Sequence, residues 1–152
     1  MAQGFSWAFN LYGGRALVEV YVMQDTETLT KGDLLSAQTN GRVDLAATND
    51  ADLLGLMQGP HNPADGTVGN PGVVAGTTAV TRVQVLTSPD AVYEDVDDTS
   101  ARDPAVTLDI SGATGAMALA TSSNADVRVI GRKEQAADPT RFMIIPGEHA
   151  YL

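Results

Sequence analysis

The chain has 152 residues, enough for one domain with a substantial hydrophobic core. With 43% hydrophobic and only 18% charged residues, its composition excludes an intrinsically disordered chain. Its 19 acidic and 9 basic residues give a net charge of −10, which argues against nucleic acid as a partner, and the absence of cysteine excludes disulfides and thiolate metal sites.

The first twelve residues contain four of the eight aromatic side chains. Apolar side chains alternate with small or polar ones at Phe5, Trp7, Phe9 and Leu11, and this period of two predicts an extended strand with one apolar face. Two interpretations remain open. The segment could be the first strand of the chain's own sheet, with its aromatic side chains in the core. It could also be an extended N-terminal arm, residues 1–14, that adds to the sheet edge or groove of a partner.

In the second interpretation, Gly13 and Gly14 form a hinge, and the partner-binding residues are Phe5, Trp7, Phe9, Leu11 and Tyr12. The segment lacks the basic start and apolar run of a signal peptide, and no later run approaches the ~20 apolar residues of a membrane span. We therefore expect a protein made and used without export and without a membrane partner.

The remainder, residues 15–152, is predicted to be a single β domain. Short runs with strand composition lie at 16–23, 34–37, 42–46, 79–86, 106–110, 117–120, 126–130 and 141–145. Asn40-Gly41 predicts a tight hairpin with positive φ at both residues. Residues 51–57 fit a short strand or one helical turn, and 111–120 could contain a short helix. Strands at this spacing predict an all-β fold, either a small β-sandwich or a partly closed β-barrel.

Two segments are predicted to be long loops. Residues 58–78 are rich in glycine and proline, which is typical of a functional or mobile loop. Residues 94–104 are acidic, but the spacing of Glu94, Asp95, Asp97, Asp98 and Asp103 does not fit a calcium-binding EF-hand. We therefore expect a solvated loop without a metal ion.

The motifs of nucleophilic, phosphate-binding and zinc-dependent sites are missing from the sequence. His61 and His149 both lie in predicted loops and are interpreted as ordinary surface histidines. The sequence therefore predicts no catalytic residue and no cofactor. Paired carboxylates of a glycosidase remain possible, although 5% aromatic residues would line a sugar-binding cleft poorly.

Three parts of the chain carry a resemblance to a known family. The first comprises Gly32-Asp33 before two leucines, Asn40-Gly41 before Arg-Val, and the run Leu53-Leu-Gly-Leu56. The second and third are residues 83–93 and 127–145. Together they span most of residues 15–145 and resemble the decoration (cement) proteins of tailed-bacteriophage heads, of which the lambda decoration protein is the familiar case.

This resemblance implies a small β domain without an active site, often a trimer, bound to the outside of the capsid in the virion. Its partner would be the major capsid protein, and bridging capsid subunits would stabilise the expanded head. Independently of the resemblance, we expect the 58–78 loop to form the contact between copies, because loops on a rigid β scaffold commonly carry binding. The alternatives are another virion component, such as a tail or fibre-attachment module, and a small carbohydrate-binding or hydrolytic β-sandwich.

Overall fold

The computed structural model describes residues 4–48, 50, 52–67, 70–77, 80–121, 125–131 and 133–151. These residues form three antiparallel sheets and two short 3-10 helices, η1 (Pro63–Asp65) and η2 (Pro146–Glu148). The predicted all-β class is confirmed. No sheet in the described part of the chain closes into a barrel, and the arrangement is consistent with a small β-sandwich. None of its helices has the length and apolarity needed to span a bilayer.

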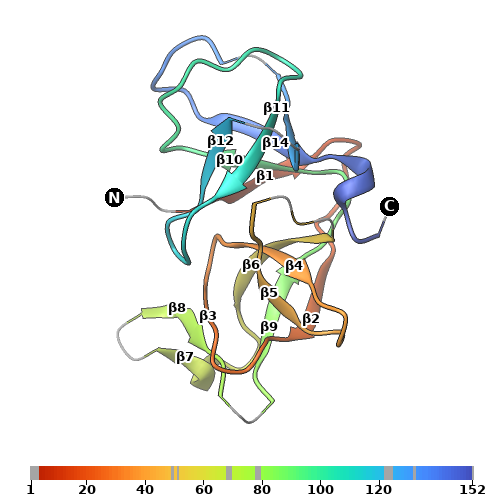
Figure 1. The fold of residues 1–152 in the computed structure, drawn as a ribbon, viewed down its shortest axis with the longest axis vertical. Coiled ribbons are helices and arrows are strands. Elements are labelled where there is room, and N and C mark those ends of the chain that lie inside the picture. Colours follow the sequence, from red (N-terminus) through yellow and green to blue (C-terminus); the bar gives the residue numbers. More distant parts are fainter. Residues whose placement is uncertain are drawn as a thin grey trace.

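The larger sheet has six strands and forms the upper half of the molecule in Figure 1. Their spatial order is β1 (Ser6–Asn10), β10 (Ala91–Asp95), β14 (Thr140–Ile144), β13 (Val127–Val129), β11 (Thr107–Ser111) and β12 (Ala118–Thr121). The predicted arm is therefore an edge strand of the chain's own sheet. Residues 111–120 form a turn and β12, with no helix.

The second sheet has five strands and lies in the lower half of Figure 1. Their order is β2 (Val18–Val22), β9 (Arg82–Leu86), β6 (Leu53–Pro60), β4 (Leu34–Ala37) and β5 (Val43–Leu45). The sheet curls until Met23, just after β2, forms a single parallel bridge with Val43 on β5. One bridge brings its first and last strands together at one corner without making a closed ladder.

The third sheet corrects the prediction of a long loop at 58–78. It consists of β3 (Thr28–Thr30), β8 (Asn70–Ala75) and β7 (Gly66–Thr67), while β6 already continues to Pro60. Leu29 pairs with Val74, and both side chains are buried. The glycines and the proline of β7 and β8 are typical of a loop, so the sequence predicts one there.

Two clusters of buried apolar side chains hold the sheets together. One lies between the two large sheets and contains Phe5, Leu34, Leu53, Leu56, Leu86, Tyr93, Ile110, Met117, Val127, Phe142 and Ile144 among others. The other lies within the curl of the five-stranded sheet and includes Val74 of the small sheet. Phe142 is the aromatic centre of the first cluster, since its ring centroid lies 4.9 Å from that of Phe5 and 5.7 Å from that of Tyr93.

Asp33 joins two distant turns by hydrogen bonds. Its buried carboxylate accepts from the backbone amides of Thr30 (2.7 Å) and Gly115 (2.8 Å) and from the Thr114 hydroxyl (2.7 Å). Burial raises the pKa of Asp33, and these hydrogen bonds oppose that rise. The Gly-Asp pair noted in the sequence therefore ties the β3–β4 turn to the β11–β12 loop.

The β4–β5 hairpin has the predicted position but a different turn. Gly41 is left-handed (φ +79°), whereas Asn40 has a negative φ. The Gly41 amide donates to the Gln38 carbonyl (2.9 Å), and the Gln38 amide donates to the Arg42 carbonyl (2.8 Å). This is the geometry of a type I turn followed by a glycine bulge, in which only the glycine needs positive φ.

Candidate interaction surface

The N-terminal segment crosses both large sheets as one continuous edge. β1 pairs antiparallel with β10 and β2 with β9, while β9 and β10 are joined by a short link. Residues 6–22 thus run antiparallel to residues 82–95, and the Leu17 carbonyl accepts from the Thr87 amide (2.8 Å) between the strands. Within the described residues, β1 and β2 are each terminal in their sheet, so the outer side of both is open.

A bulge places the aromatic side chains of β1 on different faces. Trp7 pairs with Tyr93 but Phe9 pairs with Val92, so the register shifts by one residue between them. Directly paired residues share a face, so Trp7 lies on the face of Tyr93, and Phe9 lies on the opposite face. The prediction of one apolar face is therefore wrong from the bulge onward, because period two assumes an unbroken ladder.

The two interpretations of the first strand each describe part of it. Phe5 is buried against Phe142, and its amide donates to the Gly32 carbonyl (2.8 Å). Trp7 (40% exposed), Phe9 (38%) and Leu11 (39%) are only partly covered, and Tyr12 is open at 86%. Of the five predicted partner-binding residues, Phe5 belongs to the core, while the other four lie along the open edge, with Trp7 and Phe9 on opposite faces.

Exposed apolar side chains concentrate on this edge. Eleven large hydrophobic side chains are exposed among the described residues, and seven of them lie between residues 7 and 20. We call these seven the edge-strand surface: Trp7, Phe9, Leu11, Tyr12, Leu17, Val18 and Val20. Sequence reasoning missed the last three, because the β-branched run of β2 predicts a buried strand as readily as an exposed one.

The edge-strand surface is neutral on an acidic molecule. Residues 4–22 contain one base, Arg15, and one acid, Glu19, whereas the whole chain carries −10. The nearest cation on the Phe9 side is Arg141, whose guanidinium lies 5.8 Å from the Phe9 ring centroid and pairs with Glu94 at 3.1 Å. The net charge therefore does not repel an acidic partner from this edge.

The predicted acidic loop is more ordered than expected. Glu94 and the buried Asp95 belong to β10. The Asp98 carboxylate, with only 6% of its side chain exposed, pairs with Arg102 (2.9 Å) and accepts from the Thr140 hydroxyl (2.8 Å). Burial opposes ionisation of Asp98, but these hydrogen bonds outweigh it and lower its pKa. These contacts hold Asp98, and through it Arg102, against β14. The expectation of a solvated loop is therefore wrong for the two β10 residues and for this ion pair, whereas residues 96–97, 99–101 and 103–104 are exposed as expected.

No group of three or more His, Asp or Glu side chains in the described residues has the arrangement of a metal site. The histidines also lie apart. His61 is exposed after β6, whereas His149 is buried behind η2 with its Nε2 unpartnered, so the prediction of two surface histidines is wrong for His149.

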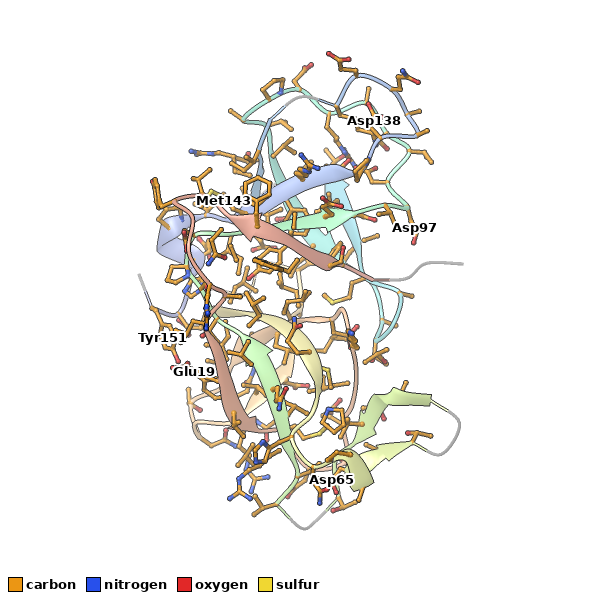
Figure 2. All side chains as sticks on the ribbon, turned by 180° about the vertical axis from the view of Figure 1, so that it is seen from behind. Glu19, Asp65, Asp97, Asp138, Met143 and Tyr151 are labelled. Atoms are coloured by element: carbon orange, nitrogen blue, oxygen red, sulfur yellow. The ribbon has the colours of Figure 1, made fainter. Side chains whose placement is uncertain are left out.

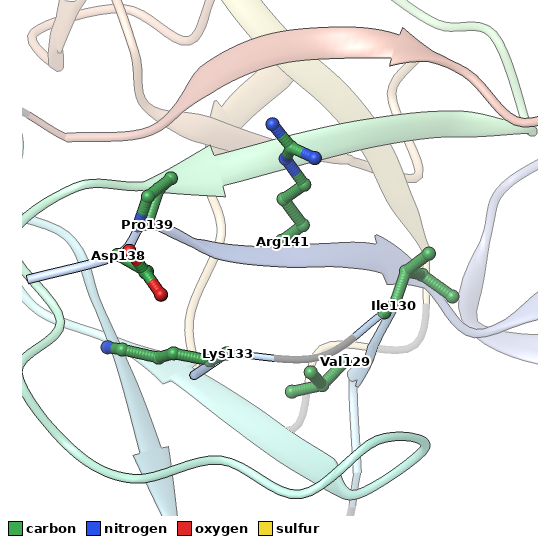
Figure 3. Close-up of a pocket in the computed structure, with 7 residues that line it drawn as sticks. Val129, Ile130, Lys133, Asp138, Pro139 and Arg141 are labelled. Carbon is green, nitrogen blue, oxygen red and sulfur yellow. The ribbon is translucent and has the colours of Figure 1, made fainter. Parts of the chain in front are cut away.

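One pocket of about 240 Å³ lies beside β14 (Figure 3). Its lining combines charged, proline and aliphatic residues: Val129, Ile130, Gly131, Lys133, Asp138, Pro139 and Arg141. The Lys133 ammonium already donates to the Thr140 hydroxyl (3.1 Å) and to the Asp98 carbonyl. The Lys133 ammonium therefore stabilises the 98–102 segment. These two hydrogen bonds account for the position of Lys133 without a ligand.

Comparison of the chain with protein-family models, curated proteins and solved structures finds no match. The edge-strand surface is thus the feature on which a functional conclusion can be based.

Proposed function

We propose that this chain is a non-enzymatic structural protein of a tailed-phage virion. In this proposal it binds the outside of the capsid through the edge-strand surface and bridges major capsid subunits, as a homo-oligomer, most simply a trimer. The observation that carries the proposal is the concentration of seven exposed apolar side chains on one open edge.

Sheet edges of monomeric proteins are normally protected, because their free amides and carbonyls can pair with another chain. The usual protection consists of lysine, proline, bulges or covering segments. β1 has a bulge, but β2 has neither Lys nor Pro, and its register with β9 is unbroken. An open edge with Trp and Tyr beside it suits strand addition, in which backbone hydrogen bonds give affinity and aromatic side chains give specificity.

The sequence pattern shared with phage decoration proteins supports the choice of partner. An apolar, neutral edge adds binding free energy between capsid subunits, and this free energy must be overcome before packaged DNA can rupture the shell. A contact of standard size would bury about 1,600 Å² in total. The role requires no chemistry at the pocket or at the histidines.

The experiment uses particles of the phage that encodes this chain, prepared with and without the protein. We expect particles lacking it to package DNA but release it at a lower temperature, and purified protein to restore the release temperature. Trp7→Ser with Val20→Ser should fail to restore it. The matched control is Val106→Ser, which also removes an exposed valine but lies before β11, far from the open edge. Equal release temperatures with and without the protein would exclude the cementing role.

A further inference from the structure

The C-terminal residues 145–151, which we call the C-terminal strap, connect the two large sheets. They leave the six-stranded sheet after β14, pass through η2 and reach the start of β6 in the five-stranded sheet (Figure 1). There, His149 forms a parallel bridge with Leu53, and the Ala150 amide donates to the Leu53 carbonyl (2.8 Å).

The far end of the strap is fixed to β2 through Glu19. The Tyr151 hydroxyl donates to Glu19 Oε2 (2.6 Å), as do the hydroxyls of Tyr21 (2.7 Å) and Thr87 (3.3 Å). Figure 2 shows Tyr151 and Glu19 side by side. Burial and the adjacent Glu19 raise the pKa of Tyr151 to about 12, so the phenol remains a donor throughout the neutral range.

His149 belongs to the first of these attachments and is 2% exposed. Its Nδ1 accepts a hydrogen bond from the Tyr151 amide (3.0 Å), which requires an unprotonated Nδ1. The neutral ring therefore carries its proton on Nε2, which is buried without a hydrogen-bond partner. Burial lowers the pKa of His149, partly opposed by the backbone of Thr87.

We propose that protonation of His149 releases the C-terminal strap from β6 and β2. A proton taken from solvent would occupy the Nδ1 lone pair that accepts from the Tyr151 amide, so two N–H groups would face each other. The ring would also become a buried cation.

Apart from the Thr87 backbone, which partly opposes the lowered pKa of His149, the groups around the ring offer this cation no compensation. Leu53 and the Thr87 backbone are uncharged. The remaining titratable groups are Glu148 and Tyr151 on the strap itself and Glu19 on β2, whose Oε2 already accepts from three hydroxyls. No ion pair to His149 is formed within the described structure.

The direction of the pH effect follows from these two states. In the released strap, the imidazole has its ordinary pKa of ~6.5, and in the closed strap its pKa is lower. The closed state is therefore fully favoured above pH ~6.5 and loses up to about tenfold in population ratio for each pH unit below it. Release would uncover the Glu19 side of β2, next to the edge-strand surface, so it would enlarge the open edge.

The test measures amide hydrogen exchange of the full chain by NMR at pH 7.5 and pH 5.5, with each rate divided by its intrinsic value. We expect protection at Ala150 and Tyr151 to fall by up to about tenfold at pH 5.5. Protection at Val92 and Val129, in the six-stranded sheet, should change far less. The imidazole nitrogen signals of His149 should titrate in the pH range in which protection is lost, below the ordinary pKa of ~6.5. Protonation of His149 without loss of protection at Ala150 and Tyr151 would overturn the proposal.

Two variants separate the ring from other acid effects. His149→Asn places an acceptor oxygen near the position of Nδ1 but does not titrate, so strap protection should no longer depend on pH. His61→Asn removes the exposed histidine and should behave as the wild type. If His149→Asn loosens the strap at both pH values, the wild-type chain still tests the proposal, because its loss of protection must occur in the pH range in which His149 takes up a proton. An equal pH-dependent loss in His149→Asn and wild type would exclude His149 as the cause.

Discussion

Phe5 precedes β1 by one residue and Phe9 lies within it, and the structure predicts opposite roles for these two identical side chains. Phe5 is 3% exposed and packs edge-on against Phe142, with ring centroids 4.9 Å apart. Phe9 is 38% exposed and contacts the Arg141 guanidinium. Replacing each by alanine therefore tests whether the first strand is divided between core and surface.

The expected losses in free energy of unfolding are larger for Phe5 than for Phe9, by a factor of roughly 1.5 to 5. Replacing a buried phenylalanine by alanine costs about 3–5 kcal/mol in free energy of unfolding. For a domain of this size, 1 kcal/mol corresponds to roughly 2–4 °C in Tm, so Phe5→Ala should lower the Tm by roughly 6–20 °C. Phe9→Ala loses only part of a buried surface and a cation–π contact of about 0.5–1 kcal/mol, so we expect roughly 1–2 kcal/mol in total.

Urea unfolding followed by circular dichroism gives both free energies, with Tm from thermal scans of the same samples. The m-value should be unchanged, since the native fold persists. Equal losses for the two variants, or a larger loss for Phe9→Ala, would refute the division of the strand. In that case the first strand would either lie entirely in the core or not belong to the sheet.

Three further results are expected. Gly55→Ala should unfold much of the protein in the same assay, because its Cβ would lie 1.8 Å from the Leu86 carbonyl oxygen at a φ of +153°. The control Gly41→Ala, with open space around it, should cost only about 1–2 kcal/mol in free energy of unfolding, and comparable losses for the two variants would contradict the close β6–β9 contact. Asp98→Ala should lower the free energy of unfolding by about 3 kcal/mol at pH 7, because it leaves the Arg102 charge poorly exposed and unpaired. The difference in stability between wild type and variant should shrink as pH drops below about 4, since Asp98, whose pKa is lowered, stabilises the fold only while it is ionised; a difference independent of pH would contradict this. Millimolar calcium should shift the Tm little. Calcium bound at 100 times its Kd would add about 2.7 kcal/mol to the free energy of unfolding, so a Tm shift of corresponding size, abolished by Asp95→Asn with Asp97→Asn, would reveal a site in the acidic segment.

Strands with a clear period or a β-branched run could be predicted from the sequence. β2, β4, β5, β9, β11, β12, β13 and β14 all lie at or within a few residues of the predicted positions. Each is bounded by turn residues and has side chains that alternate or are mostly apolar, so local pattern and tertiary environment agree. Because these strands could be predicted locally, the all-β class could be predicted as well.

Other elements depend on contacts that a local pattern does not contain. β10 begins inside an apolar run and ends in the acids Glu94 and Asp95, so its charges suggested a connector. Asp95 is nevertheless buried, and burial raises its pKa while the Asp97 amide hydrogen bond opposes this rise. The pairing of β10 with β14 buries Asp95 and brings Asp98 to Thr140, 42 residues away in the sequence. Without that pairing, neither the burial of Asp95 nor the Asp98–Thr140 contact could be predicted.

For the candidate surface, the sequence identified its aromatic half but not its geometry. Alternation cannot distinguish a free arm from an edge strand, since both are extended, and it cannot predict the bulge between Trp7 and Phe9. The contribution of Leu17, Val18 and Val20 became visible only once β2 was placed at the edge of its sheet. Edge position is a property of topology and not of composition.

The most direct test of the central claim is co-sedimentation of the purified chain with capsids of the tailed phage proposed to encode it, at about 0.1 M salt, where surface charges are screened beyond ~10 Å. The proposal predicts that the wild type and Val106→Ser sediment with the capsids. Trp7→Ser with Val20→Ser should remain folded by circular dichroism and lose at least about tenfold in affinity, equivalent to 1.4 kcal/mol. Equal binding of all three folded proteins, or no binding of the wild type, would contradict a capsid-binding role for the edge-strand surface.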